Sequence, residues 1–185
     1  MPTRRTEGVP TDVPRWETAF IALGGNVGDV RSAMSAALCR LHRHREVRVD
    51  SISALYRTPP WGDTDQADFL NASAQVSVRL EPLQLLRLAK KLEREQKREK
   101  TRRWGPRTLD IDLLVWPGRE LETAKLTLPH PRIAERAFVL LPLADIAPDL
   151  ELGRGNVSAL AAAADRSGIE RIAEQGEWWR PGDCV

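Results

Sequence analysis

Two aspartates spaced one residue apart are the residues of this 185-residue sequence best suited to chemistry. Asp110 and Asp112 alternate with Leu109, Ile111 and Leu113, and in a strand this alternation puts both carboxylates on one face. Two neighbouring carboxylates repel each other, so the pair needs cations nearby to stay charged. A hard divalent metal that also binds substrate phosphates meets this need. Taken alone, the pattern fits an edge strand with a solvated acidic face at least as well.

A positively charged segment leads into the aspartates. Lysine and arginine are dense between residues 90 and 107, and Arg103 and Arg107 flank Trp104 and a Gly-Pro turn. Ion pairs along a helix account for part of this charge, but the charge continues beyond the predicted helix. Guanidinium groups bind phosphate oxygens through paired hydrogen bonds. The combined segment 102–112, RRWGPRTLDID, therefore indicates a site for a metal–nucleotide complex.

Two further segments are candidates for ligand binding. The connection over residues 58–69, TPPWGDTDQADF, is too long for a tight hairpin, and loops of this length in compact domains are usually functional. Trp61 on this loop could cover a planar ligand or fold back onto the sheet. His130 is fixed between Pro129 and Pro131 and has little reason to serve as core filler. Both segments are expected to approach the site of the aspartates.

Composition excludes several classes of protein. Hydrophobic residues at 42% and charged residues at 29% are ordinary for a soluble globular domain, and a formal net charge of +2 is too small to indicate nucleic-acid or membrane binding. No apolar run approaches membrane-spanning length, and residues 1–17 lack the apolar centre of a secretory signal. We expect a cytoplasmic monomer that acts on small molecules and binds neither nucleic acid nor membrane.

The cysteine count points the same way. Cys39 falls on the apolar side of a predicted helix, and Cys184 is next to the C-terminus. Two cysteines this far apart form neither a disulfide framework nor a metal-binding spacing. The pattern favours a reducing compartment, and we expect no disulfide bond.

Hydrophobic patterning predicts one α+β domain. Strands are expected over residues 18–23, 47–57 with one irregularity, 71–78 and 109–116, and helices are expected after Asp29 and from Pro82. The order strand, helix, strand, strand, helix, strand is that of a ferredoxin-like βαββαβ core. Such a core has an antiparallel-rich sheet with both helices on one face, and we place the site on the other face. We expect a disordered tail over 1–17, a single domain over 18–175 and a C-terminal tail over 176–185.

Several separated motifs occur in a specific order along the chain. They are GGNVGD at 24–29, YRTPP at 56–60, FLN at 69–71, RWGPRTLDID at 103–112, PHP at 129–131 and RAF at 136–138. In this order they resemble the 6-hydroxymethyl-7,8-dihydropterin pyrophosphokinase family of folate biosynthesis. The resemblance runs from about residue 20 to about residue 150. Each motif is weak alone, but the ordered set is highly specific.

The resemblance implies an ATP-dependent diphosphokinase. Such an enzyme transfers diphosphate from MgATP to the hydroxymethyl group of 6-hydroxymethyl-7,8-dihydropterin, giving AMP and the pterin diphosphate. Attack at the β-phosphorus leaves the protein to position the reactants and to neutralise charge, without a covalent intermediate. The implied cofactors are two Mg²⁺ ions held by Asp110 and Asp112, with ATP as co-substrate.

Site residues are implied position by position. The implied catalytic residues are Arg98, Arg107, Asp110 and Asp112. The implied ATP-binding residues are Glu93, Arg98, Arg103, Trp104, Arg107, Ile111, His130 and Arg136. The implied pterin-binding residues are Thr58, Pro59, Trp61, Phe69, Asn71 and Phe138. Asn71 would read the hydrogen-bonding edge of the pterin, and Phe138 would stack on its ring.

Four positions depart from the usual family pattern. Gly25 stands where serine is usual, Phe69 where tyrosine is frequent, and Lys97 where glycine often precedes the first loop arginine. Lys100 stands where arginine is common, and an ammonium gives a point charge in place of a two-pronged contact. These differences concern contact geometry and loop movement, not the activity.

Two other classes of protein are the alternatives. A ferredoxin-like RNA-binding module shares the topology, but it stacks bases on strand aromatics, which residues 71–78 lack. Without metal, Asp110 and Asp112 would also repel a phosphate backbone. An Asp-x-Asp metal enzyme acting on sugar nucleotides would not need the proline-rich loop at 58–60 or His130 between prolines.

Overall fold

The computed structural model describes residues 15–60, 65–96 and 105–184. Its strands are β1 (Glu17–Gly25), β2 (Val47–Ile52), β3 (Leu55–Thr58), β4 (Phe69–Val78), β5 (Asp110–Val115), β6 (Leu121–Glu122), β7 (Thr127–Leu128) and β8 (Glu170–Ala173). Its helices are α1 (Val30–His42), α2 (Pro82–Glu95), α3 (Ala137–Ile146) and α4 (Val157–Ala163), with short 3-10 turns at Ile133–Glu135 and Pro181–Asp183.

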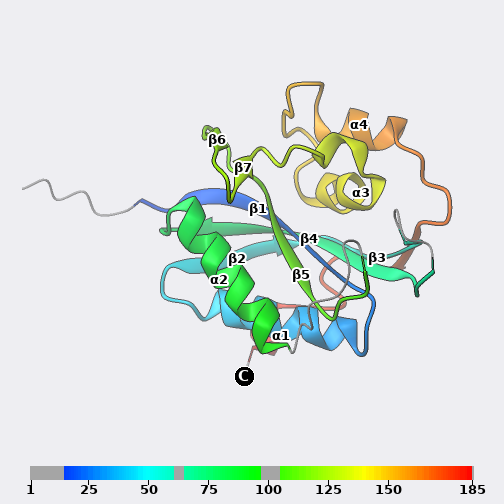
Figure 1. Ribbon diagram of the computed structural model, residues 1–185, viewed down its shortest axis with the longest axis horizontal. Helices are drawn as coiled ribbons and strands as arrows, with labels where there is room; N and C mark the ends of the chain where they lie inside the picture. The colour runs from blue at the N-terminus through cyan, green and yellow to red at the C-terminus, as the bar shows by residue number, and fades with distance from the viewer. Residues whose placement is uncertain (1–14, 61–64, 97–104, 185) are drawn as a thin grey trace, which may run out of the picture.

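The main sheet of the described residues is antiparallel and has six strands. The strand order is β5-β1-β4-β3-β8, and β2 pairs with β4 beside β3. The elements β1, α1, β2 with β3, β4, α2 and β5 reproduce the predicted ferredoxin-like βαββαβ order (Figure 1). The predicted irregularity between residues 47 and 57 is also confirmed, because this segment divides into β2 and β3 around residues 53 and 54.

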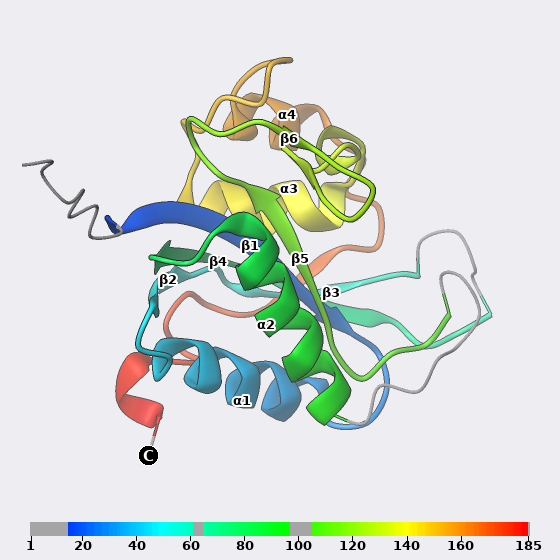
Figure 2. The same cartoon turned by 60° about the vertical axis from the view of Figure 1, so that its left-hand side comes forward.

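Helices lie on both faces of the sheet. The helices α1 and α2 cover one face, as predicted, while α3 and α4 lie on the opposite face (Figures 1 and 2). The expectation that this second face is free was therefore wrong. The apolar run over residues 139–143 forms a helix whose Val139 and Leu143 pack against Phe20, Leu114 and Val115 of the sheet. Burying this apolar surface holds α3 against the sheet beside the site.

Local sequence signals explain where the first helices begin. Asp29 caps α1, because its carboxylate accepts a hydrogen bond of 3.0 Å from the backbone N–H of Ser32. Pro82 occupies the first turn of α2, where a missing N–H costs nothing. The N-cap Glu81 and Gln84 complete a reciprocal capping box at the same helix end. No helix within the described residues is long and apolar enough to cross a lipid bilayer.

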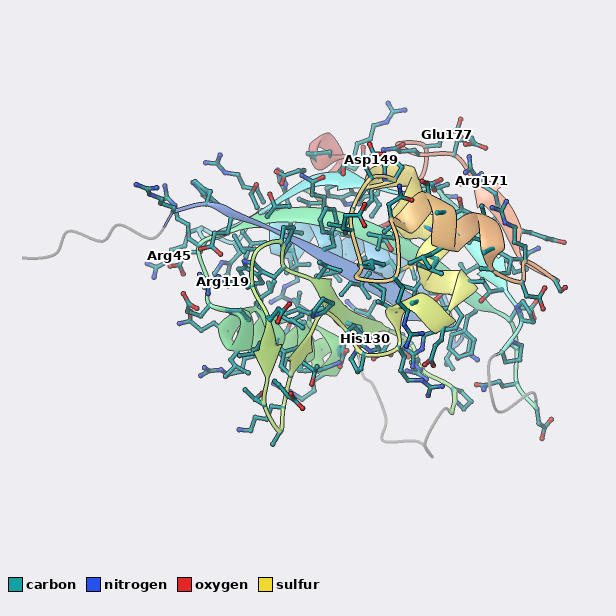
Figure 3. All side chains as sticks on the ribbon, turned by 90° about the horizontal axis from the view of Figure 1, so that it is seen from above. Arg45, Arg119, His130, Asp149, Arg171 and Glu177 are labelled. Atoms are coloured by element: carbon teal, nitrogen blue, oxygen red, sulfur yellow. A yellow bond between two sulfur atoms is a disulfide. The ribbon has the colours of Figure 1, made fainter. Side chains whose placement is uncertain are left out.

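The chain after β5 is anchored to the start of β1. Arg119 forms ion pairs of 2.7 Å with both Glu17 and Glu81, and Trp116 donates its indole N–H to Glu17 at 2.6 Å (Figure 3). Beyond this anchor the short β6–β7 hairpin returns the chain toward β5. It ends at the cis Leu128–Pro129 peptide bond, directly before His130.

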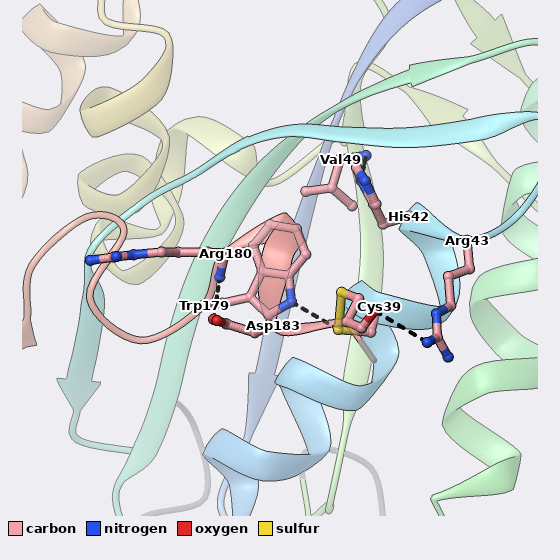
Figure 4. The surroundings of a disulfide bond; sticks show 8 residues. Cys39, His42, Arg43, Val49, Trp179, Arg180 and Asp183 are labelled. Atoms are coloured by element: carbon pink, nitrogen blue, oxygen red, sulfur yellow. Dashed lines mark hydrogen bonds between the residues drawn. A yellow bond between two sulfur atoms is a disulfide. The ribbon is translucent and has the colours of Figure 1, made fainter.

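The C-terminal segment contributes to the core. Trp178 and Trp179 are buried, and the indole N–H of Trp178 donates to the backbone carbonyl of Ser53 at 2.9 Å. The indole N–H of Trp179 lies 3.4 Å from Cys39 Sγ on α1 (Figure 4). Part of the segment expected to be a tail thus packs as an integral element of the fold.

A disulfide bond joins Cys39 to Cys184, which corrects the expectation of no disulfide (Figure 4). The two Cα atoms lie 5.1 Å apart although 145 residues separate the cysteines in sequence. Arg43 supports the same contact by donating to the backbone carbonyl of Cys184 at 3.1 Å. The pairing depends on the buried tryptophans that bring the C-terminus to α1, and sequence spacing carries no signal of such long-range packing.

Candidate active site

An open pocket lies between the sheet and the start of α3. Its cavity volume is about 150 Å³. Its lining residues are Ala22, Leu23, Gly24, Thr58, Pro59, Phe69, Asn71, Arg107, Asp110, Asp112, Leu114, His130, Arg136, Phe138 and Val139.

Most of the predicted site residues that the structure describes meet in this pocket. They are Thr58, Pro59, Phe69, Asn71, Arg107, Asp110, Asp112, His130, Arg136 and Phe138. Four predicted residues, Trp61, Arg98, Arg103 and Trp104, lie outside the described residues. Glu93 and Ile111 lie behind the pocket: Ile111 is fully buried in the core and its backbone N–H donates to Glu93. Any ATP contact of Ile111 would therefore involve its backbone.

The edge strand β5 presents the two aspartates to the pocket. In its register with β1, Asp110 lies opposite Gly24 and Asp112 opposite Ala22. The alternate residue Ile111 points to the core on the other face. The predicted alternation is confirmed, and it places both carboxylates on the pocket side.

Among the residues that the structure describes, Arg107, Lys90 and Arg136 are cations near the aspartate pair. Arg107 forms an ion pair with Asp110, and Lys90 Nζ lies 3.7 Å from Asp110 Oδ1 and 3.8 Å from Asp112 Oδ1. Burial and the charge of Asp110 raise the pKa of Asp112, while Lys90 and Arg136 act in the opposite direction. The pair therefore still favours additional positive charge.

Lys90 and Glu93 connect α2 to the aspartate strand. The buried Glu93 carboxylate accepts from the Ile111 N–H at 2.8 Å and from Lys90 Nζ at 2.6 Å. Burial raises the pKa of Glu93, and the Lys90 ammonium opposes this shift. Lys90 was missing from the predicted site, although its i,i+3 spacing to Glu93 on a helix could have indicated it.

The opposite end of the pocket is built from β3 and β4. Asn71 is buried and donates its side-chain N–H to Thr58 Oγ1 at 2.7 Å. Gly24 leaves room for this amide, because a Cβ at position 24 would lie 2.9 Å from Asn71 Oδ1. Gly25 allows an equally close approach, since a Cβ there would lie 2.4 Å from the backbone oxygen of Thr108. The departure from the family's usual serine thus accompanies tight packing at the start of the aspartate strand.

Asn26 connects the two loops that border the pocket. Its backbone N–H donates to the Arg107 carbonyl at 2.8 Å, and its Oδ1 accepts from the Arg107 N–H at 2.9 Å. Its Nδ2 donates at 3.0 Å to both Gln66 Oε1 and the Ala67 carbonyl. Asn26 was not among the predicted site residues, because no local pattern in the sequence indicates these contacts.

His130 and Arg136 close the pocket beside Asp112. The backbone N–H of His130 donates to the Leu114 carbonyl of β5 at 2.7 Å. The ring Nδ1 of His130 accepts from the backbone N–H of Arg132 at 3.2 Å. Burial lowers the pKa of His130, and Asp112 opposes the shift. A neutral ring in this arrangement carries its proton on Nε2. Burial likewise lowers the pKa of Arg136, whose guanidinium carbon lies 5.7 Å from the centre of the Phe138 ring.

The available side chains suit a metal ion that the protein and the substrate coordinate together better than a metal ion enclosed by protein ligands alone. Two carboxylates offer hard oxygen ligands. Among the residues that the structure describes, no group of three or more His, Cys, Asp or Glu side chains is arranged to hold a metal ion. Water and ligand oxygens would complete the coordination, as is usual for Mg²⁺ bound with a phosphate substrate.

Comparison with known proteins identifies the family. A family model described as 7,8-dihydro-6-hydroxymethylpterin-pyrophosphokinase matches residues 20–148. A 2-amino-4-hydroxy-6-hydroxymethyldihydropteridine pyrophosphokinase from Methylorubrum extorquens is 46% identical over 154 residues, which cover 83% of this chain and 98% of the relative. The protein of the same name from Bacillus subtilis is 42% identical over 151 residues, covering 82% and 87%.

Solved structures agree on the fold. The crystal structure of Plasmodium falciparum HPPK-DHPS with pterin and p-hydroxybenzoate superimposes with a TM-score of 0.68 at 15% sequence identity. The match covers 88% of this chain and 48% of that one, so this chain spans about half of its length. With the sequence match over residues 20–148, the chain belongs to the 7,8-dihydro-6-hydroxymethylpterin-pyrophosphokinase family.

Proposed function

We propose that this pyrophosphokinase transfers diphosphate from MgATP to the hydroxymethyl group of 6-hydroxymethyl-7,8-dihydropterin, giving AMP and the pterin diphosphate. One observation carries the proposal: a single pocket has Asp110 and Asp112 of β5 at one end and Asn71 of β4, two strands away, at the other, and Phe138 of α3 also lines it. The first end suits phosphates with their metal, and the second suits a flat, hydrogen-bonding ring. A reaction between the two substrates needs both ends in one space.

Positive side chains would hold the nucleotide phosphates. Arg107, His130 and Arg136 line the same part of the pocket as the two aspartates. The two guanidinium groups can each bind a pair of phosphate oxygens, and a neutral His130 would donate through Nε2. In our proposal Arg98, Arg103 and Trp104, outside the described residues, complete the nucleotide contacts from the basic segment. Glu93 and Ile111 support this end through their contact behind β5.

Asp110 and Asp112 would hold the metal, and we propose two Mg²⁺ ions. The raised pKa of Asp112 supports this assignment, because burial and the charge of Asp110 disfavour its anionic form and a bound cation would offset both effects. When bound, Mg²⁺ neutralises phosphate charge and lowers the pKa of a coordinated hydroxyl. The protein fixes the positions of the two carboxylates through the pairing of β5 with β1.

The pterin would bind at the other end of the pocket. The Asn71 amide, fixed by its hydrogen bond to Thr58, would pair with the polar edge of the ring. Phe138 would stack on one face, and Phe69 and Pro59 would border the ring. We also assign Trp61 to this end, although it lies outside the described residues. Burying a planar ring between aromatic side chains, with its polar edge paired, gives both affinity and orientation.

We further propose that the protein acts as a cytoplasmic monomer. The support for a monomer is that this chain alone brings the aspartates, Asn71 and Phe138 into one pocket. ATP is the co-substrate, which favours an intracellular site of action. The Cys39–Cys184 disulfide is unusual for such a compartment, because thiols there are generally kept reduced.

The test is to incubate the protein with ATP, Mg²⁺ and the hydroxymethyl dihydropterin, and to follow AMP against ADP. We expect AMP in an amount equal to the pterin diphosphate, and none when pterin or Mg²⁺ is omitted. Release of ADP, or AMP formation that does not depend on pterin, would contradict the proposal.

A further inference from the structure

A polar network joins α3 to the sheet away from the aspartates; Tyr56 is buried in it, and Arg171 lies at its exposed edge. Asp145, near the end of α3, accepts hydrogen bonds from the Ala54 N–H at 3.1 Å and from the Tyr56 hydroxyl at 2.9 Å. It also accepts from Arg171 of β8 at 2.8 Å, and Arg171 in turn donates to the Tyr56 hydroxyl oxygen at 2.9 Å. One carboxylate therefore holds together a helix, the strand β3 and the strand β8.

The members of this network satisfy one another. Tyr56 is 5% exposed, and burial raises its pKa to about 12, so its hydroxyl remains protonated and donates to Asp145 at neutral pH. Arg171 compensates the charge of Asp145, whose side chain is largely buried. Removing Tyr56 or Asp145 leaves the other without this partner in a poorly solvated place, which costs more than the loss of an exposed contact.

The network ties together two elements that line the pocket, the strand β3 and the helix α3. On β3, Tyr56 pairs with Asn71 of β4, and Thr58 lies two residues further along. On α3, Phe138 lies seven residues before Asp145, which is about two helical turns or roughly 10 Å. The position of the helix relative to β3 therefore sets the gap between Phe138 and the Asn71–Thr58 pair.

The aspartates lie on a different part of the sheet. The strand order places β1 and β4 between β5 and β3, a separation of about 14 Å at ordinary strand spacing. In the view from above, Arg171 and His130 are likewise well apart (Figure 3). The network is therefore nearer to the Asn71–Thr58 pair, which faces the proposed pterin, than to the aspartates.

We propose that Asp145, Tyr56 and Arg171 are positioning residues for the pterin ring, and that β8 is thereby a part of the substrate-binding structure. Because β8 lies beyond residues 20–148, this assigns a role to a segment outside the family match. The inference rests on the proposed pterin substrate. According to this inference, the network affects the binding of the flat pterin ring and not the binding of the nucleotide.

The test compares the steady-state KM for each substrate in Tyr56→Phe, Asp145→Asn and the double variant. We expect the pterin KM to rise about 3-fold to 10-fold in each single variant, with kcat and the ATP KM within about 2-fold of wild type. Because both changes break one network, the rise in pterin KM in the double variant should be smaller than the product of the two single rises. Tyr56→Phe removes a single oxygen atom, so it remains informative if Asp145→Asn does not fold.

Glu170→Gln is the matched control. Arg57 and Glu170 form an exposed ion pair of 3.2 Å that joins the same two strands, β3 and β8, without involving α3. We expect this variant to keep the wild-type pterin KM, because exposed ion pairs contribute little. Arg171→Gln should instead behave like Tyr56→Phe.

Two results would overturn the inference while leaving the proposed function in place. One is an unchanged pterin KM in folded Tyr56→Phe and Asp145→Asn proteins. The other is a parallel rise of both KM values that follows a loss of melting temperature, which would mark a purely structural network. Absence of pterin-dependent AMP formation by the wild-type protein would overturn the proposed function, and this inference with it.

Discussion

Asn26 and Arg107 are joined by two hydrogen bonds, one in each direction, at 2.8 and 2.9 Å. The same Asn26 side chain holds Gln66 and Ala67 of the loop that follows β3. The glycine-rich turn at residues 24–28 therefore serves as a connector between the proposed pterin loop and the start of the aspartate strand. The turn contains neither the Gly-x-Gly-x-x-Gly pattern nor the lysine of a Walker phosphate-binding loop, which agrees with this connecting role.

Replacing Asn26 should weaken both ends of the site. Asn26→Ala removes three side-chain hydrogen bonds, and we expect kcat/KM to fall by about 10-fold to 100-fold for both substrates. Steady-state kinetics with each substrate varied in turn would measure this. Val27→Ala is the neighbouring control, because the Val27 side chain is exposed. Equal activity of the two variants would show that the connection between the loops is unimportant.

Replacing Gly24 should affect the pterin end selectively. In Gly24→Ala the new methyl group would lie 2.9 Å from Asn71 Oδ1 and would displace the amide from its bond to Thr58. We expect the pterin KM to rise about 10-fold with a smaller change in the ATP KM. Gly182→Ala serves as the control, because a Cβ at that position meets no atom within 4 Å. A normal pterin KM in Gly24→Ala would argue against Asn71 as a ring contact.

Lys90 should contribute to stability through buried Glu93. Lys90→Met removes a cation that lies 2.6 Å from the Glu93 carboxylate, and we expect the free energy of unfolding to fall by about 2 kcal/mol. Lys91→Met, one residue later, removes an exposed ion pair to Glu95 at 4.0 Å and should change stability by less than about 0.5 kcal/mol. Denaturant unfolding of the two variants measures the difference. Equal stabilities would contradict the account of Lys90 as the partner of a buried carboxylate.

The single tyrosine offers a direct pH test of the Asp145 network. Burial raises the Tyr56 pKa from 10.0 to about 12 in the folded protein, so the folded state binds this proton more tightly than the unfolded state. The corresponding stability is complete below pH 10 and is lost as the pH rises toward 12. Near-ultraviolet absorbance of tyrosinate, which arises from Tyr56 alone, should follow this titration. Ionisation near pH 10 in the folded protein would show that the hydroxyl is exposed to solvent.

Local patterns in the sequence were sufficient for the elements that carry the aspartates. The alternation around Ile111 fixes the faces of β5, and the cap at Asp29 and the proline at position 82 mark the helix starts. Family motifs then predicted further residues that line the pocket, namely Thr58, Pro59, Phe69, Asn71, Arg107, His130, Arg136 and Phe138. These signals succeed because each depends on residues close together in sequence.

The features that the sequence did not reveal depend on long-range packing. The apolar run at 139–143 is too short to distinguish a strand from a buried helix, so the helix α3 on the second sheet face was not predicted. Trp178 and Trp179 show no periodic pattern, although their burial helps to bring Cys184 to Cys39. Asn26 and Lys90 acquire their partners from other elements of the fold.

The most direct test of the account is the Mg²⁺-dependent, pterin-dependent formation of AMP by Asp110→Ala and Asp112→Ala. Each substitution removes one carboxylate from the proposed metal site while the β5–β1 register stays in place. We expect kcat/KM to fall by at least about 1,000-fold in each variant, with an unchanged circular dichroism spectrum. AMP formation within about 10-fold of wild type in either folded variant would contradict the assignment of these aspartates to the metal and the phosphates.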